Sequence, residues 1–422
     1  MTKDIIQEKI NQIAEKYSDK KFLIYGAGIF SKRIFETYDL SKINIVGIAD
    51  KRFETENIKT SYTTLPPYTP QEIKNIDFDC SLILLKNADC VKQMFKNLSK
   101  EIVTLDEYWE LEYKNHYVMS HLGSFKQYFL EHNMPDIIKK YKKGMDKKSA
   151  AVLDKTLNKM LHIQDSQFDG QVKYNNFFAD YFWDEDDINN TKTYLKNKNL
   201  YKDKYKLTKN EYNADVFLFK HGLENASDKL KKYVSGKDFV DGGAFIGDSV
   251  LVLEEFNPNK IYSFEISKST TEEYLKVMGL NNVPKEKYEI INMGLSDKPK
   301  EILFNDISAQ YTNVFWNGNS KVKCTDLDSI VKEKKMNVGF IKADLEGALI
   351  PALKGMTKTI RKYRPVLCLA IYHSPEEFFE AKPLLEKITR FLNYKIELQY
   401  QEVQPLIINE TVLFAYPKEL EK

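Results

Sequence analysis

Short apolar runs alternate with amphipathic segments over the first 113 residues of the chain. The apolar runs predict strands at 21–25, 44–49, 79–85 and 101–105, and the segments at 5–17 and 32–38 have helical spacing. Strands that alternate with helices form parallel sheets with right-handed crossovers. We therefore expect a small Rossmann-like domain at residues 1–113.

The same alternation is most regular from residue 237 to residue 422. Seven strands are predicted there, at 238–240, 260–264, 288–292, 338–343, 365–372, 394–400 and 410–416. An excursion with two more extended segments, 301–304 and 321–324, separates the third strand from the fourth. Because the last two strands read as a hairpin, the pattern indicates an α/β fold with a doubly wound sheet whose last strand is antiparallel.

The region between them, residues 114–236, is predicted to be mainly helical. Apolar residues at 117–141 and 147–161 recur at helical spacing. An aromatic segment at 175–183 precedes the acidic run 184–187. This run lacks the ligand spacing of a calcium-binding EF-hand, so we interpret it as a solvated turn or a helix start.

The composition is that of an ordinary globular protein, with 42% hydrophobic and 29% charged residues. Lys and Arg number 63 against 61 Asp and Glu, so no strong field favours nucleic acid. No apolar run is long enough to span a membrane and the N-terminus is charged, so a cytoplasmic location is expected. No CxxC pair or disulfide pattern occurs among the four cysteines, Cys80, Cys90, Cys324 and Cys368.

The segment after the strand at 238–240 is the strongest candidate for a ligand site. Asp241 is followed by a glycine-rich turn, and a helix is predicted to begin near Asp248. In open α/β sheets, ligands bind beyond the carboxyl ends of the strands. About 20 residues further on, Glu265 ends the next strand, where an acid can accept both ribose hydroxyls of an adenosine. NAD-binding folds use the same acid, and a purely structural turn is the alternative.

The spacing of the turn and the segments after it resemble the FkbM-type methyltransferases. The resemblance covers roughly 200 C-terminal residues and is carried by Asp241-Gly-Gly-Ala-Phe-Ile-Gly247, Phe264-Glu265, Asn292 to Asp297, Thr325 to Asp328, Ile341 to Gly347, Leu353-Lys-Gly355, Ala370 to His373 and Glu410 to Ala415. It differs from many members at Phe245, where they have Asn.

The resemblance implies a class I methyltransferase domain at residues 237–422 that transfers a methyl group from S-adenosyl-L-methionine to oxygen. The implied cofactor-binding residues are Asp241, Gly242, Gly243, Ala244, Gly247, Asp248, Glu265, Ile266 and Asn292.

Asp344, Glu346 and His373 are the candidate catalytic residues. Asp344 and Glu346 follow the fourth strand and His373 follows the fifth, so we expect them to converge near the transferred methyl group. His373 is the candidate base, because the pKa of histidine is ordinarily near neutrality; a histidine that caps the next helix is the alternative. Carboxylates suit Mg²⁺, but no acidic pair follows the fifth strand, and no metal site is assigned.

Lys342 and the pair His221-Gly222 are interpreted as structural, and stacking of a sugar on Tyr311, Phe315 or Trp316 is a weaker hypothesis.

The N-terminal domain carries a second glycine turn, Gly26-Ala-Gly28, with Asp50 after the next strand. This approaches a dinucleotide fingerprint, but Ser31 replaces its third glycine, which disfavours NAD. A nucleotide-sugar anchor, an interaction domain and a fold without a ligand remain open.

Together these features predict an O-methyltransferase for a hydroxyl of a sugar or nucleotide-linked sugar, in surface glycan synthesis. A non-sugar acceptor, an NAD-linked sugar-modifying oxidoreductase and a non-catalytic scaffold are the alternatives. A homodimer is left open.

Overall fold

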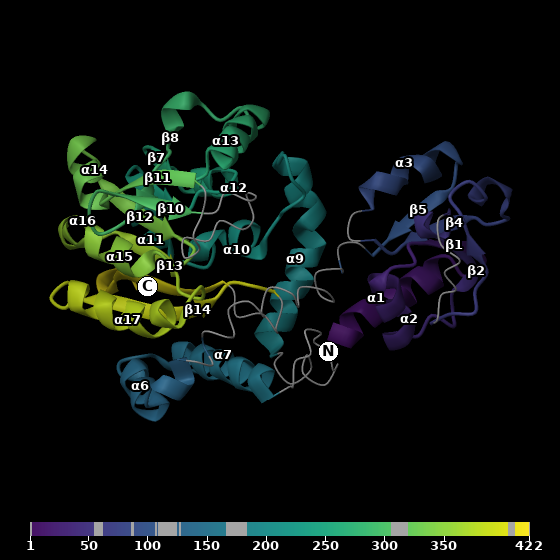
Figure 1. Ribbon diagram of the computed structural model, residues 1–422, viewed down its shortest axis with the longest axis horizontal. Coiled ribbons are helices and arrows are strands. Elements are labelled where there is room, and N and C mark those ends of the chain that lie inside the picture. The colour runs from purple at the N-terminus through teal and green to yellow at the C-terminus, as the bar shows by residue number, and fades with distance from the viewer. Residues whose placement is uncertain are drawn as a thin grey trace. The chain divides into compact units, whose positions relative to one another are not determined.

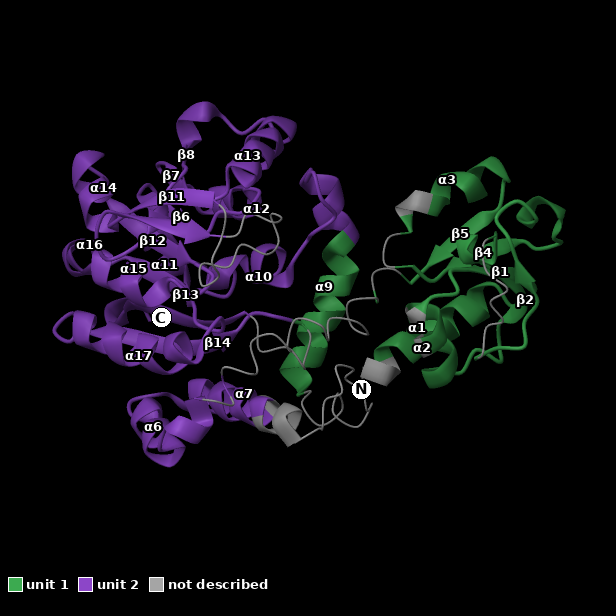
Figure 2. Cartoon of the chain, in the orientation of Figure 1, with its two compact units in different colours: residues 1–117, 170–198, 403–406 green, residues 118–169, 199–402, 407–422 purple. Residues whose placement is uncertain are grey.

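The computed structural model describes residues 2–54, 62–85, 88–105, 108, 125, 128–165, 184–304, 320–403 and 410–421 (Figure 1). The chain divides into two compact units (Figure 2). Unit 1 comprises residues 1–117, 170–198 and 403–406, and unit 2 comprises residues 118–169, 199–402 and 407–422. The predicted three-part division of the chain stays a prediction.

Unit 1 contains a parallel sheet of five strands, as expected for a small Rossmann-like domain. The strand order is β3-β2-β1-β4-β5, and every pair is parallel. The strands are β1 (Lys21–Tyr25), β2 (Asn44–Ala49), β3 (Pro67–Tyr68), β4 (Cys80–Ile83) and β5 (Glu101–Thr104). In the described part of residues 1–117, the helices that accompany them are α1 (Thr2–Lys16), α2 (Ile29–Thr37) and α3 (Asp89–Asn97). The two-residue β3 was not predicted, because a Pro-Tyr pair gives no strand pattern.

The acidic run at 184–187 starts a helix, α9 (Glu185–Lys204). The backbone N–H of Asp187 donates to Oδ1 of Asp184 at 2.9 Å, and the N–H of Asp184 donates to Oδ2 of Asp187 at 3.2 Å. This reciprocal pair caps the first turn, whose N–H groups lack partners within the helix. The interpretation as a helix start is confirmed, whereas the aromatic segment 175–183 lies outside the described residues.

Unit 2 is built on a sheet of seven strands in the order β14-β15-β13-β12-β6-β7-β8. The neighbours of β15 are antiparallel to it and the other pairs are parallel. The α/β fold class is therefore confirmed. The strands are β6 (Asp238–Gly242), β7 (Ile261–Phe264), β8 (Tyr288–Ile291), β12 (Val338–Ala343), β13 (Val366–Ala370), β14 (Tyr394–Tyr400) and β15 (Thr411–Pro417).

The predicted excursion forms a small separate sheet. Its strands β9 (Gly294–Leu295), β10 (Lys300–Phe304) and β11 (Ser320–Thr325) have the order β10-β11-β9. Tyr311, Phe315 and Trp316, the candidates for sugar stacking, lie outside the described residues.

Helices cover unit 2's main sheet on both faces. They are α6 (Met134–Lys142), α7 (Lys147–Asp165), α10 (Ala214–Phe217), α11 (Asp228–Val234), α12 (Asp248–Leu253), α13 (Lys268–Leu280), α14 (Leu327–Glu333), α15 (Leu349–Gly355), α16 (Thr357–Tyr363) and α17 (Pro375–Thr389). Short 3₁₀ turns lie at Lys51–Glu54, Ile73–Asn75, Lys220–Gly222, Glu254–Phe256, Lys285–Lys287 and Lys418–Leu420. No helix in the described ranges combines the length and apolar character that crossing a bilayer requires.

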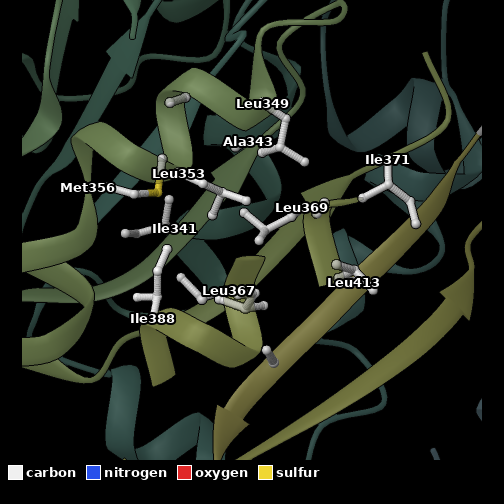
Figure 3. Packing of buried hydrophobic residues seen from close by; sticks show 14 of the residues in the cluster. Ile341, Ala343, Leu349, Leu353, Met356, Leu367, Leu369, Ile371, Ile388 and Leu413 are labelled. Carbon is white, nitrogen blue, oxygen red and sulfur yellow. The ribbon is translucent and has the colours of Figure 1, made fainter. Parts of the chain in front are cut away.

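Successive residues of the central strands enter two different hydrophobic clusters. Ile341, Leu367 and Leu369 belong to one cluster, which also includes residues of α15 and α17 (Figure 3). Phe340 and Cys368 belong to the other, with α12 and α13. Because side chains alternate across a strand, a strand buried on both faces is apolar throughout. This explains why these strands appear in the sequence as continuous apolar runs.

The strand register brings several carboxyl ends to the same edge of the sheet. In β6, Gly242 is paired with Ala343 of β12 on one side and with Phe264 of β7 on the other. The N–H groups of Gly243 and Ala244 both donate to the carbonyl oxygen of Phe264 at 3.0 Å. The residues that follow β6, β7 and β12 therefore start from neighbouring positions, and the candidate site is built from them.

Candidate active site

The glycine turn after β6 is closely packed against the segment that follows β12. Gly243 and Gly247 have φ values of +74° and +84°, which favour glycine. A Cβ atom at Gly243 would lie 1.8 Å from the carbonyl oxygen of Asp344. The N–H of Asp344 in turn donates to the carbonyl oxygen of Gly242 at 2.9 Å. The turn thus requires glycine for a close backbone approach, and it holds residue 344 beside the predicted cofactor site.

Glu265 lies at the carboxyl end of β7 with its side chain turned to the glycine turn. Its Oε2 accepts the N–H of Phe245 at 3.0 Å, and its Oε1 accepts the N–H of Ser267 at 2.8 Å. Burial raises the pKa of Glu265 to about 7, although these backbone donors act in the opposite direction. Nδ2 of Asn292 donates to the carbonyl oxygens of Glu265 and Ile266 at 2.8 and 3.0 Å. Asn292 therefore fixes the backbone around the acid, and Phe245 contributes through its N–H group.

Asp241 and Lys342 form a buried ion pair under the turn. Nζ of Lys342 lies 3.2 Å from Oδ1 of Asp241 and donates to the carbonyl oxygen of Gly243 at 2.6 Å. Burial disfavours the charged amine, but Asp241, Asp344 and Asp248 outweigh it and raise the pKa of Lys342. Asp241 is fully buried beneath the turn, with Lys342 as its counter-charge. Its predicted contact with the cofactor stays a prediction.

Asp248 is the first residue of α12 and is buried. Its Oδ1 accepts the N–H of Ser249 at 2.9 Å. Burial raises the pKa of Asp248 to about 7, with Lys342 opposing and Asp241 adding to the effect. The structure therefore gathers the predicted cofactor-binding residues around one turn.

Asp344, Glu346 and His373 converge, as their positions after two adjacent strands suggested. Nε2 of His373 lies 3.1 Å from Oδ1 of Asp344 and 3.7 Å from Oε2 of Glu346. One donor atom from each of the three side chains lies within 4.8 Å of the others. The His373 side chain is 4% exposed, that of Asp344 25% and that of Glu346 49%, so the cluster opens to solvent at Glu346.

A third carboxylate, which the sequence reasoning missed, lies behind His373. Glu377 lies in the first turn of α17, with its Oε2 3.3 Å from Nδ1 of His373. Its Oε1 accepts the N–H of Leu349 at 2.7 Å. Burial disfavours the imidazolium, but Glu346, Asp344 and Glu377 raise the pKa of His373 well above its ordinary value. The sequence did contain a signal for Glu377, because His373 and Glu377 are four residues apart at the start of a predicted helix, a spacing that brings side chains together.

Further polar groups surround the open side of Asp344. The hydroxyl of Tyr372 lies 3.4 Å from Oδ2 of Asp344 and donates to Oε1 of Glu410 at 3.1 Å. Burial and neighbouring carboxylates, Asp248 and Glu402 first among them, raise the pKa of Asp215 to about 8. Sequence reasoning found neither Asp215 nor Glu402, since only the folded chain brings them to the strand ends.

His221 lies inside unit 2, as its structural interpretation requires. Its Nε2 lies 2.9 Å from Oγ of Ser249, and burial together with Lys342 lowers its pKa to about 3. A neutral, buried imidazole at this position contributes packing and one polar contact.

The glycine turn of unit 1 differs in how its acid is used. Oδ2 of Asp50 accepts the N–H of Ala27 at 2.6 Å, and Arg52 donates to Asp50 through its backbone N–H and its guanidinium at 2.9–3.2 Å. Asp50 is therefore engaged by Arg52 within its own loop. A ribose bound there would have to compete with a cationic side chain for the same carboxylate.

Comparison with known proteins identifies one family. Residues 241–401 match the model of the methyltransferase FkbM domain, a segment that contains every predicted cofactor and catalytic residue. No curated protein matches the chain at the sequence level.

Several solved structures are similar to the chain at low sequence identity. The FkbM methyltransferase of Methylobacillus flagellatus KT is 14% identical, with a TM-score of 0.48 over 97% of this chain and 93% of that one. An rRNA methylase of Streptococcus thermophilus is 12% identical, with a TM-score of 0.29 over 45% and 92%. A candidate methyltransferase of Streptococcus mutans, solved with SAH, is 12% identical, with a TM-score of 0.27 over 44% and 92%. At these scores the structural similarities do not bear on the chemistry.

Proposed function

Since residues 241–401 match the model of the methyltransferase FkbM domain, we propose that the chain is an S-adenosylmethionine-dependent O-methyltransferase. The acceptor in this proposal is a hydroxyl group of a sugar or nucleotide-linked sugar, in the synthesis of a surface glycan. A non-sugar small molecule with a hydroxyl group is the second candidate acceptor.

One observation carries the proposal. The glycine turn that approaches Glu265 also packs against the backbone of Asp344, so the adenosine-binding acid and the reactive cluster belong to one edge of one sheet. A cofactor whose ribose lies at Glu265 would direct its other end along that edge, toward Asp344 and His373. Methyl transfer requires such an arrangement, in which one end of the cofactor is held and the other end lies beside the reacting groups.

S-adenosylmethionine supplies a methyl group on a positively charged sulfur. As the acceptor oxygen bonds to that carbon, the carbon–sulfur bond breaks, S-adenosylhomocysteine is released and the hydroxyl proton departs. In the proposal, Glu265 and Asp241 hold the cofactor, and Asn292 and Gly243 keep the loops in place. Orientation of the acceptor in line with the carbon–sulfur bond contributes on the order of 7–11 kcal/mol.

The cluster of Asp344, Glu346 and His373 receives the acceptor hydroxyl and its proton. The ring of His373 lies among three carboxylates, and a charged imidazolium cannot accept a proton. For His373 to act as the base, the ring must be neutral when the acceptor binds. Removal of the hydroxyl proton by a positioned group is worth roughly 10²–10⁴-fold in rate.

The polar groups beside Asp344 support a hydroxyl-rich acceptor. Asp215, Glu402 and Glu410 supply carboxyl groups, and Tyr372 supplies a hydroxyl group. Carboxyl oxygens accept hydrogen bonds from hydroxyl groups, as they do from ribose.

The first experiment is calorimetric titration of the full chain with S-adenosylhomocysteine, NAD and NADP in separate runs. We expect micromolar binding of S-adenosylhomocysteine, a loss of at least tenfold in Glu265→Ala, and no change in Glu272→Ala, which removes an exposed acid of α13. Binding of NAD alone would contradict the proposal and favour an oxidoreductase.

Incubation with S-adenosylmethionine and a panel of nucleotide sugars and free sugars then tests the acceptor class. Mass spectrometry should find one added methyl group on a sugar hydroxyl. Methylation of non-sugar hydroxyl compounds alone would select the second candidate.

A further inference from the structure

Three side chains from two adjacent strand ends form a mixed oxygen and nitrogen donor set. Asp344 and Glu346 follow β12, and His373 follows β13. Nε2 of His373 faces Oδ1 of Asp344 at 3.1 Å and Oε2 of Glu346 at 3.7 Å, and all three donor atoms lie within 4.8 Å. A cation at the centre of such a set would lie about 2–2.5 Å from each donor, the range seen for divalent metals.

Negative charge outweighs positive charge around His373. Three carboxylates, Asp344, Glu346 and Glu377, surround one imidazole, and the buried Lys342 forms its ion pair with Asp241 instead, at 3.2 Å. Glu346 reaches solvent, whereas Glu377 is buried and Asp344 is 25% exposed. The formal charge of −2 on these two exceeds the +1 of a protonated ring, and a divalent cation would offset it, since buried carboxylates without a counter-charge are costly.

Glu377 prepares the histidine to act as a ligand. Its buried carboxylate lies 3.3 Å from Nδ1, and its other oxygen is held by the N–H of Leu349 at 2.7 Å. A carboxylate at one ring nitrogen holds the proton there and leaves the lone pair of the other nitrogen for a metal, an arrangement typical of metal-binding histidines. In this chain Glu377 contacts Nδ1, so the nitrogen left to bind a metal is Nε2, which faces Asp344 and Glu346.

Asp344 and His373 are already in contact, because Oδ1 of Asp344 lies 3.1 Å from Nε2 of His373. A cation bound between these two atoms would replace their contact with two metal–ligand bonds.

We propose that Nε2 of His373, Oδ1 of Asp344 and Oε2 of Glu346 together bind one divalent cation. Glu346 is the most exposed of the three, so an acceptor would reach the cation from the solvent side of Glu346. The role toward the acceptor rests on the proposed methyl transfer, whereas cation binding does not. A set of two carboxylates and one imidazole suits Mn²⁺ and related first-row metals.

In this arrangement the cation takes the place of the proton on His373, and the ring stays neutral. An acceptor hydroxyl bound to the cation would lose its proton more easily, because the positive charge stabilises the oxyanion. With Nε2 bound to the cation, His373 would not accept that proton, which would leave to water on the solvent side of Glu346. Glu377 does not touch the cation or the acceptor and acts as a positioning residue.

The test uses Mn²⁺ alone as the probe. The full chain, freed of metal with a chelator and then dialysed, is titrated with Mn²⁺ without S-adenosylmethionine or acceptor, and free Mn²⁺ is followed by electron paramagnetic resonance. We expect one saturable site. Both Glu346→Gln, which removes a ligand, and Glu377→Gln, which removes the partner of Nδ1, should weaken it at least tenfold. The matched control is Glu376→Gln, an exposed neighbour in the same turn of α17, which should bind Mn²⁺ as the unchanged chain does.

No saturable binding by the unchanged chain, or equal affinity in Glu346→Gln, would overturn the proposal. Titration of each variant with S-adenosylhomocysteine shows that unit 2 is folded and reports on the methyltransferase proposal independently. Mn²⁺ binding without S-adenosylhomocysteine binding would refute that function but keep the metal site, and the reverse result would refute the metal site alone.

Discussion

Glu265 is a residue whose ionisation should affect cofactor binding. Burial raises its pKa to about 7 in the folded chain, so it is largely neutral below that pH and ionised above it. Ribose hydroxyls donate more strongly to a carboxylate than to a carboxylic acid. The affinity for S-adenosylhomocysteine should therefore rise with pH through about 7, and in Glu265→Gln it should be at least tenfold weaker, with a flatter pH profile. Calorimetry across this range measures both.

The raised pKa of Glu265 also makes the stability of the ligand-free chain depend on pH, in the opposite direction to the affinity for the cofactor product. A folded-state pKa of about 7 lies above the ordinary value of 4.5, so between these values the folded state binds more protons than the unfolded state. Stability then falls as pH rises through this window. In Glu265→Gln the free energy of unfolding, measured by denaturant titration, should fall less as the pH rises. A profile identical to that of the unchanged chain would show that Glu265 is not buried in the free protein.

At the scale of elements, the connection between β6 and α12 depends on glycine at one position. In Gly243→Ala the new Cβ would meet the carbonyl oxygen of Asp344 at 1.8 Å, at a φ of +74°. Either the turn or the Asp344 segment must move, and S-adenosylhomocysteine binding should fall at least tenfold by calorimetry. Gly279→Ala is the control, since nothing lies within 4 Å of its Cβ. Gly279 lies in α13, and its replacement by alanine should leave the free energy of unfolding unchanged or raise it by roughly 0.4–1 kcal/mol. Equal behaviour of the two variants would contradict this account.

At the scale of the whole molecule, the two compact units should respond differently to the cofactor product. Glu265 and the turn belong to unit 2, whereas Asp50 in unit 1 is engaged by Arg52. At about 100 times its dissociation constant, S-adenosylhomocysteine should stabilise the unit that binds it by about 2.7 kcal/mol. Hydrogen exchange followed by mass spectrometry should show slower exchange in β6 and β7 and no change in β1 and β2. Equal protection of β1 would place a binding site in unit 1 as well.

The fold class could be predicted because the signals are local. Strands buried on both faces appear as apolar runs, and β1, β2, β12 and β14 have their predicted bounds. The two-residue strands β3 and β9 were missed, since they are defined by their partners rather than by a pattern of their own. The glycine turn and Glu265 were also found in the sequence, because a βα turn and an acid at the next strand end are neighbours along the chain.

By itself, the sequence determined the α/β alternation, the position of the glycine turn and the convergence of Asp344, Glu346 and His373 after adjacent strands. Only the tertiary structure decided the burial, the partners and the charge of these groups. It placed Glu377 behind His373, paired Lys342 with Asp241 and brought Asp215 and Glu410 toward Asp344. The physical reason is that a strand pattern depends on neighbours in the chain. A charge depends on burial and on partners a few ångströms away in space, which for Asp344 come from segments remote in sequence.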